Sequence, residues 1–158
     1  MTQTASRLVC AGCGAEIPAK TPIAWPCPAA QPGDDIDHVL EVVRDPTGVA
    51  YTTDDAEPSE NPFERYRDRF HSNQVARAAG WSDERYIELV RGLDEAIAAV
   101  DGNGFRTTPF VRTRELDDRL GFSGGGGIRI KDETGNVSGS HKARHLMGVM
   151  LALRVAES

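Results

Sequence analysis

The chain has 158 residues, enough for one domain of ordinary size and too few for most two-domain enzymes, so we expect it to be one part of something larger. Its 39% hydrophobic and 27% charged residues are typical of a soluble protein with a modest core and exclude a fibre. The net charge of −6 has the wrong sign for a general nucleic-acid binder. The longest apolar run, over 146–155, is too short to cross a bilayer, and residues 1–20 lack the apolar block of a signal peptide. We therefore expect a cytoplasmic protein that binds neither nucleic acid nor membrane.

Residues 1–60 are predicted to form an irregular cysteine-containing lobe with one small hairpin. The first 36 residues are rich in Pro, Gly, Ala and Cys, and they show no sustained apolar period of a strand or a helix. Segments 39–43 and 49–52 are short and β-branched, and Asp-Pro-Thr-Gly lies between them. This arrangement predicts two small strands joined by a turn.

Residues 61–158 are predicted to hold a helical segment followed by a strand, a loop and a helix. The Asn-Pro pair at 61–62 is typical of a helix start, and a second helical stretch ends at Gly80. Ser82 begins the clearest helix, whose apolar residues share one face as far as Asp-Gly at 101–102. The remaining predicted elements are a helix over 112–120, a strand over 128–131 and a helix over 140–157.

The motif that carries chemistry is KDETGNVSGSHKARH at residues 131–145. It places Lys142 in the first turn of the last predicted helix, after a narrow loop of small residues. The positive end of the helix macrodipole disfavours the ammonium form there and helps to expose a neutral nucleophile for carbonyl chemistry. The alternative is a solvated first-turn lysine with no chemical role, which the Gly-Ser-x-Lys segment taken alone favours.

This motif strongly resembles the signature of the fold-type II pyridoxal-phosphate enzymes, the family of threonine synthase, the serine and threonine dehydratases and the tryptophan synthase β chain. In that family a strand ending in Lys-x-Glu precedes a small-residue loop, Ser-Phe-Lys and a helix, and the lysine forms the Schiff base with the cofactor. The resemblance implies that Lys142 is the catalytic and cofactor-binding lysine. It also implies that His141, in place of the usual Phe, contacts the cofactor, and that Ser138 and Ser140 bind the substrate.

The resemblance covers roughly residues 8–155, since Thr108-Pro109 and the glycine-rich approach to the strand also match the family's N-terminal region. It implies the N-terminal part of a three-layer α/β/α fold with a parallel sheet, incomplete alone. The family's phosphate-binding loop follows the lysine helix, and the glycines at 124–127 precede a strand, so we interpret them as a flexible connection.

We expect a second polypeptide to supply the phosphate-binding loop and most of the sheet. A parallel strand over 128–131 needs neighbouring strands and covering helices. The last helix also presents an apolar face that needs a cover, formed by Leu146, Met147, Met150 and Leu153. The complex would be supplied as separate subunits or as the product of truncation or cleavage.

The activity implied by the resemblance is elimination or replacement at the β- or γ-carbon of an amino-acid substrate, by a threonine-synthase-like or dehydratase-like lyase. The second hypothesis is a non-catalytic interaction module or subunit in which the lysine motif is inherited but idle.

The cysteines are Cys10, Cys13 and Cys27, and an odd, clustered count favours metal binding or its remnant over a disulfide framework. They resemble the cysteine pattern of threonine-synthase-like proteins, and Cys10-x-x-Cys13 looks like half of a zinc knuckle. Ala30 stands where the fourth thiolate is expected, and no spacing rule supports His38 as its substitute. An occupied zinc site and a zinc-free lobe with structural cysteines both stay open. In either case we expect the cysteines to be dispensable for chemistry.

The other candidate residues have mainly structural or solvent-exposed interpretations. His71 is predicted to be an ordinary helix-end residue, and His145 either lines the lysine site or covers a neighbour. Three acidic pairs lie in polar surroundings and are expected to be solvated: Asp34-Asp35, Asp54-Asp55 and Asp117-Asp118.

Overall fold

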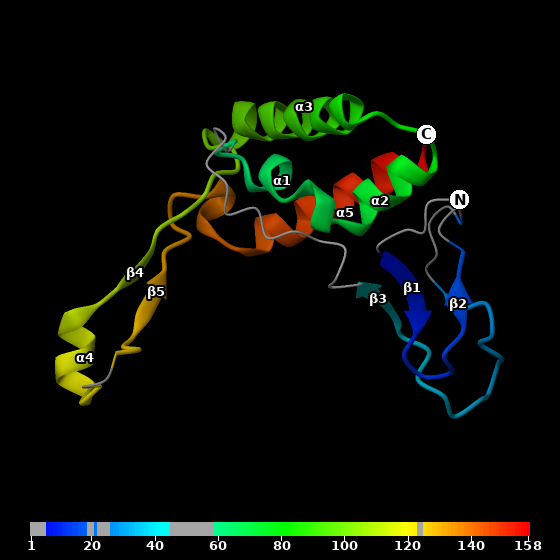
Figure 1. The fold of residues 1–158 in the computed structure, drawn as a ribbon, viewed down its shortest axis with the longest axis horizontal. Helices are drawn as coiled ribbons and strands as arrows, with labels where there is room; N and C mark the ends of the chain where they lie inside the picture. The colour runs from blue at the N-terminus through cyan, green and yellow to red at the C-terminus, as the bar shows by residue number, and fades with distance from the viewer. Residues whose placement is uncertain (1–5, 19–20, 22–25, 45–58, 123–124) are drawn as a thin grey trace.

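The computed structural model describes residues 6–18, 21, 26–44, 59–122 and 125–158. Figure 1 shows three parts: a lobe formed by residues 6–44, a central helical body, and an arm formed by residues 110–131. The lobe and the arm extend from opposite ends of the body, so the molecule has the outline of an arch. The strand predicted over 49–52 and the acidic pair at 54–55 lie outside the described residues, as does Gly124.

The lobe is built on a three-stranded antiparallel sheet with the order β2-β1-β3. Its strands are β1 (Ser6–Cys10), β2 (Glu16–Ile17) and β3 (Leu40–Arg44). The strand predicted over 39–43 is confirmed within one residue, but its described partner is β1, in a segment where we predicted irregular structure. The strands β1 and β2 are too short to show an alternating apolar pattern in the sequence. The pairing of β1 with β3 joins segments about thirty residues apart, so it has no local signal either.

The helical body contains the longest helix, whose two ends follow from local sequence. The Ser82 hydroxyl accepts a hydrogen bond from the Arg85 N–H, and Gly102 ends the helix in the left-handed conformation at φ 85°. None of the described helices is long and apolar enough to span a membrane. The elements are α1 (Pro62–Arg65), η2 (Arg67–Arg69), α2 (His71–Ala78), α3 (Asp83–Asp101), η3 (Val137–Gly139) and α5 (Lys142–Ala156).

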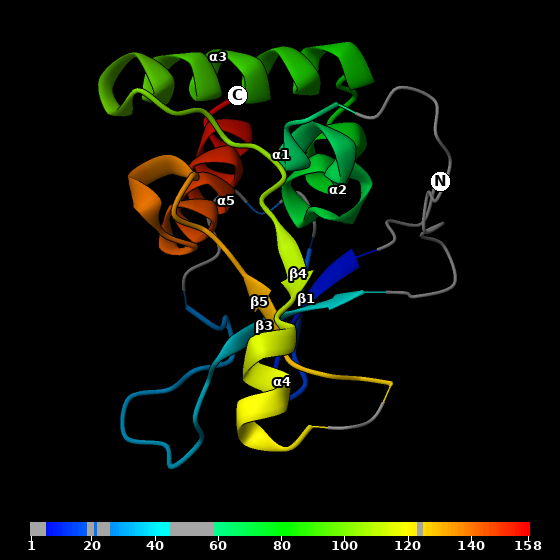
Figure 2. The same cartoon turned by 90° about the vertical axis from the view of Figure 1, so that its left-hand side faces the viewer.

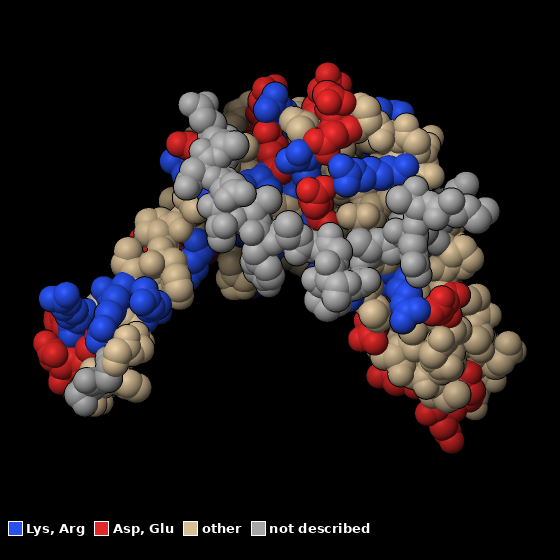
Figure 3. Space-filling view, viewed as in Figure 1, with Lys and Arg blue, Asp and Glu red and all other residues tan. Residues whose placement is uncertain are grey.

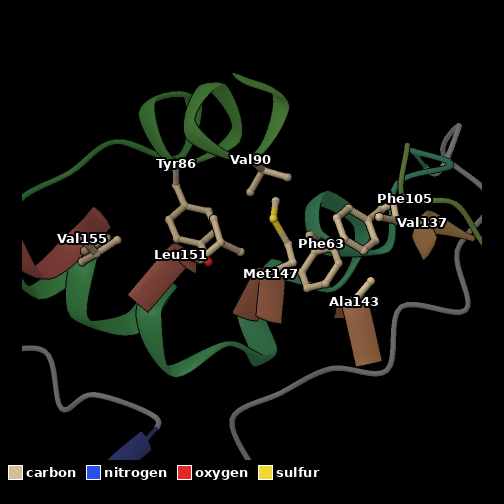
Figure 4. Close-up of a cluster of buried hydrophobic side chains, with 10 residues drawn as sticks. Phe63, Tyr86, Val90, Phe105, Val137, Ala143, Met147, Leu151 and Val155 are labelled. Carbon is tan, nitrogen blue, oxygen red and sulfur yellow. The ribbon is translucent and has the colours of Figure 1, made fainter. Parts of the chain in front are cut away.

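The core lies where α5 packs beneath α3 and beside α2. Figure 4 shows Met147 and Leu151 of α5 directed towards Tyr86 and Val90 of α3, and all four side chains are at most 1% exposed. The expectation that Met147 needs a second chain to cover it is therefore corrected, because α3 covers it. Leu146, on the other side of α5, is 63% exposed.

The arm is an antiparallel ribbon of β4 (Phe110–Arg112) and β5 (Arg129–Lys131), with α4 (Arg114–Leu120) at its tip (Figure 2). The strand predicted over 128–131 thus pairs with a strand that we did not predict. Among the described residues no strands pair in parallel, and the parallel sheet remains a proposal. Figure 3 shows Lys and Arg side chains gathered on the arm. Its exposed apolar residues are Phe110, Val111, Leu120, Phe122 and Ile130.

Asp117 connects α4 to the strands of the arm. Its carboxylate accepts hydrogen bonds from the Ile128 N–H at 2.5 Å and from Arg112 Nε at 2.6 Å, and it is only 3% exposed. These contacts, the Ile128 N–H first, lower the pKa of Asp117. The expectation of a solvated Asp117 is wrong, because the backbone just before β5 lies against the Asp117 carboxylate of α4. Gly127 has a left-handed backbone at φ 63°, and a Cβ there would have to displace the side chains of Arg112 and Asp117.

Candidate functional site

Lys142 is the first residue of α5, and its side chain is exposed. Its backbone N–H donates to the hydroxyl of Ser140 at 3.2 Å, while its amine forms no hydrogen bond or ion pair with any described residue. The amine of Lys131, by contrast, donates to the Thr108 carbonyl at 2.6 Å and lies 3.6 Å from a carboxylate oxygen of Glu133. Of these two lysines, only Lys142 has an amine with no hydrogen bond or ion pair to a described residue.

The loop before Lys142 has a fixed shape. Ser138 and Gly139 both have left-handed backbones, at φ 53° and φ 57°. The Ser138 N–H donates to the carboxylate of Asp101 at 2.9 Å, and the Asn136 side-chain amide donates to the Ser140 carbonyl at 3.1 Å. Asn136 is 1% exposed, and its side-chain oxygen has no partner among the described residues. Because these bonds anchor both ends of the turn, the start of α5 is held in place.

The predicted cofactor and substrate residues surround this turn. His141 and Ser138 are exposed, and His141 precedes α5 without capping it through its side chain. Ser140 is half-buried, and its hydroxyl is engaged by the Lys142 N–H. Of the two predicted substrate-binding serines, only Ser138 has a side chain without a hydrogen bond to another described residue.

A network centred on Glu133 ties the base of the arm to the first turn of α5. Its carboxylate accepts a hydrogen bond from the Thr108 hydroxyl at 2.6 Å and another from Arg144 Nε at 2.9 Å. Arg144 also donates to the Arg106 carbonyl at 2.8 Å. Burial works to raise the pKa of Glu133, but the bonds from Thr108 and Arg144 outweigh it and lower that pKa. Arg144 follows Lys142 by two residues, so the network positions the lysine.

We expect Glu133→Gln to lower the free energy of unfolding by about 1.5–3 kcal/mol, because it leaves the half-buried Arg144 without its charged partner. The loss will depend on pH. With a lowered folded-state pKa, the Glu133 contribution is fully present above the ordinary value of 4.5 and is lost as the pH falls through the folded value. Urea denaturation at pH 3 to 7, on the protein in the form in which it purifies, measures both effects.

The matched control is Glu157→Gln, which removes a carboxylate whose contact with Arg154 is 59% exposed on each side. It should change stability by less than about 0.5 kcal/mol. Equal losses for the two variants would show that the Glu133 network does not stabilise the start of α5.

His71 and His145 lie along a cavity of about 530 Å³ between the lobe and the helices α2 and α5. His71 begins α2 and shares a 2.9 Å hydrogen bond with the Ser6 hydroxyl, so it joins the lobe to the body rather than ending a helix. Burial, followed by the charge of Arg44, lowers the pKa of His71. Lys142 is not among the described residues that line this cavity, so His145 lines a space that the lysine does not.

The lobe brings four metal-ligating side chains together: Cys10, Cys13, Cys27 and His38. Their ligand atoms all lie within 4.8 Å of one another. The Sγ atoms of Cys13 and Cys27 are 3.6 Å apart, and the Sγ of Cys10 is 3.4 Å from Nδ1 of His38. His38 is thus the functional residue that spacing alone did not assign, since its position depends on the pairing of β3 with β1.

The electrostatics of this cluster favour a thiolate beside a charged imidazole when no metal is bound. Burial works to raise the pKa of Cys10, but hydrogen bonds, first from the Cys13 N–H and then from His38, lower it to about 6. The bond to Cys10 and the carboxylate of Asp34 raise the pKa of His38 to about 9. Asp34 is therefore not a solvated acid, as we expected, but the partner of His38 Nε2 at 3.0 Å.

The Glu133 network could have been found only in part from the sequence. Thr108 and the Lys-x-Glu pair of 131–133 lie in segments that the sequence analysis singled out, but nothing local shows that they meet Arg144. No family model, no curated protein and no solved structure matches the chain. The function is therefore argued from the residues and their geometry.

Proposed function

We propose that this chain is the lysine-bearing part of a pyridoxal-phosphate-dependent enzyme that catalyses elimination or replacement at the β- or γ-carbon of an amino acid. A second polypeptide supplies the phosphate-binding loop and the rest of the sheet. The three unpaired cysteines support a reducing, cytoplasmic location.

The observation that carries this proposal is the free amine of Lys142 at a rigid turn. A catalytic lysine must be accessible to a carbonyl and held in one place by its surroundings. Lys142 is exposed, starts a 15-residue helix, and follows a turn anchored by Asn136 and Asp101. A lysine with no role beyond solubility needs none of this support.

The residues present fit the lysine's part of such a site. Bound pyridoxal phosphate supplies an electron sink for the carbanion at the substrate Cα. Lys142 would hold the cofactor through its amine, and the same amine would move the proton at the substrate Cα. Ser138 and His141 lie in the segment just before Lys142 and are exposed, so both are available to bind and orient ligands there. The Glu133 network holds the helix that bears the lysine.

The second candidate is a non-catalytic subunit with an idle lysine motif. The exposed apolar residues of the arm favour it as much as they favour a catalytic subunit, because both need a partner. The two functions differ in whether the lysine bonds to the cofactor.

The test is absorption spectroscopy of the purified complex with added pyridoxal phosphate. We expect an absorption band near the edge of the visible range that borohydride removes. The matched control is Lys131→Ala, which removes an amine that is already engaged and should leave the band. A complex with no such band at saturating cofactor would contradict the proposal and favour the second candidate, a non-catalytic subunit.

A further inference from the structure

We propose that the lobe binds one structural Zn²⁺ ion through the Sγ atoms of Cys10, Cys13 and Cys27 and through Nδ1 of His38. We further propose that Asp34 orients the histidine from outside the coordination sphere. This inference does not depend on the function of Lys142, which lies in a different part of the chain.

The two shortest separations given for the ligand atoms are close to those of tetrahedral zinc, and all four atoms lie within 4.8 Å of one another. With Zn–S near 2.3 Å and Zn–N near 2.0–2.1 Å, a tetrahedral ion holds its ligand atoms about 3.5–3.8 Å apart. The separations of 3.6 Å between Cys13 and Cys27 and of 3.4 Å between Cys10 and His38 lie close to this range. Three sulfurs and one nitrogen are also a donor set that zinc prefers.

The backbone around the ligands is folded as two tight turns. In the first, the Gly14 N–H donates to the Cys10 carbonyl at 2.8 Å, and the Cys10 N–H donates to the Ala15 carbonyl at 2.9 Å. In the second, the Ala29 N–H donates to the Sγ of Cys27 at 3.4 Å. An N–H directed at a cysteine sulfur stabilises the thiolate that a metal needs.

Gly12 shows how closely the first turn approaches the segment that carries His38. A Cβ atom at this position would overlap the carbonyl oxygen of Asp37. The residue before the histidine therefore packs directly on the cysteine turn, and only glycine allows that approach.

Asp34 gives the histidine the tautomer that zinc requires. Nε2 of His38 lies 3.0 Å from the carboxylate of Asp34, which leaves Nδ1 facing Cys10. The Asp34 carboxylate is itself held by the backbone N–H groups of Gln31 and Ile36. A carboxylate partner of this kind fixes the ring and raises its basicity as a ligand.

The lobe needs the metal because it has almost no hydrophobic core. Among its described residues, the buried apolar side chains are those of Cys10, Ile17 and Cys27, and two of these three are ligands. A domain of this size that lacks a core usually folds around a metal or disulfides. All four positions are filled by protein atoms, which is typical of a structural site rather than a catalytic one.

The experiment measures the metal content and metal affinity of the full chain with any partner that co-purifies. We expect one zinc per chain, and replacement by Co²⁺ should give the intense visible bands of a tetrahedral thiolate site. His38→Ala should weaken zinc binding by more than about 100-fold, and Asp34→Asn by about 10–100-fold. Asp35→Asn, next to Asp34 but without its contacts, should bind zinc as the unmodified chain does.

His38→Cys keeps the test valid if His38→Ala does not fold, because a fourth thiolate should retain zinc and strengthen the sulfur-to-cobalt absorption. Absence of zinc in protein purified without chelators, together with no Co²⁺ spectrum, would overturn the site. A Cys13–Cys27 disulfide in freshly isolated protein would also overturn it. Unchanged affinity in His38→Ala would remove His38 from the ligand set.

Discussion

Replacing Lys142 with alanine will abolish turnover by the complex and leave its fold in place. The rate should fall by about 10⁴-fold or more, because the proposal makes Lys142 the residue that bonds to the cofactor. Stability should change by less than about 0.5 kcal/mol, since the Lys142 side chain is exposed and forms no hydrogen bond or ion pair with another described residue. Exchange of the substrate Cα proton with solvent deuterium, followed by NMR over a panel of amino acids, measures the loss whichever amino acid is the substrate.

Lys142→Arg separates the charge of the side chain from its chemistry. Arginine keeps the positive charge at the start of α5 but cannot act as the amine nucleophile. We therefore expect Lys142→Arg to be as inactive as Lys142→Ala. Normal exchange in either variant would remove Lys142 from the mechanism.

Residues 1–158 expressed alone will aggregate, and co-expression with the second polypeptide will make them soluble. The arm extends from the body with large apolar side chains exposed to water, among them Phe110 at 59%, Val111 at 55% and Phe122 at 53%. Neighbouring apolar side chains on a projecting ribbon, with unpaired strand edges, drive association. Intact mass of all chains that co-purify, with light scattering of the complex, measures the outcome.

A charge on the arm tests whether that surface is the interface. Val111→Glu should weaken the complex by more than about 10-fold, since a buried unpaired carboxylate costs well over 1.4 kcal/mol. The matched control is Val100→Glu on α3, where the valine is 91% exposed and lies outside the arm. A monodisperse, cooperatively melting monomer that binds pyridoxal phosphate tightly would defeat the expectation of a partner.

The elements that the sequence predicted well are those whose signals are local. The limits of α3 follow from the Ser82 cap and from Gly102, and both signals act within one turn of the helix. The start of α5 at Lys142 is within two residues of its prediction, and there the Ser140 hydroxyl accepts a hydrogen bond from the Lys142 N–H. The strand β5 was also predicted, but its antiparallel partner β4 was not, and the helix predicted over 112–120 begins at the last residue of β4.

The contacts that sequence reasoning missed are between segments far apart in the chain. His38 reaches the cysteines because Cys10 is opposite Leu40 in the register of β1 and β3, which brings the end of the preceding loop beside the first cysteine turn. Glu133 meets Thr108 and Arg144 only once the arm has folded back to the body. Neither set has a fixed spacing, so only the three-dimensional arrangement identifies it.

The most direct test of the central claim is to find which lysine bonds to pyridoxal phosphate. The chain has only three lysines, Lys20, Lys131 and Lys142. Borohydride treatment of the cofactor-loaded complex makes the bond permanent, and peptide mass mapping then locates the added pyridoxyl mass. We predict that the mass is found on the peptide that contains Lys142 and is absent from the Lys142→Ala complex. Labelling of Lys131 or Lys20 instead, or of no lysine in this chain, would contradict the account.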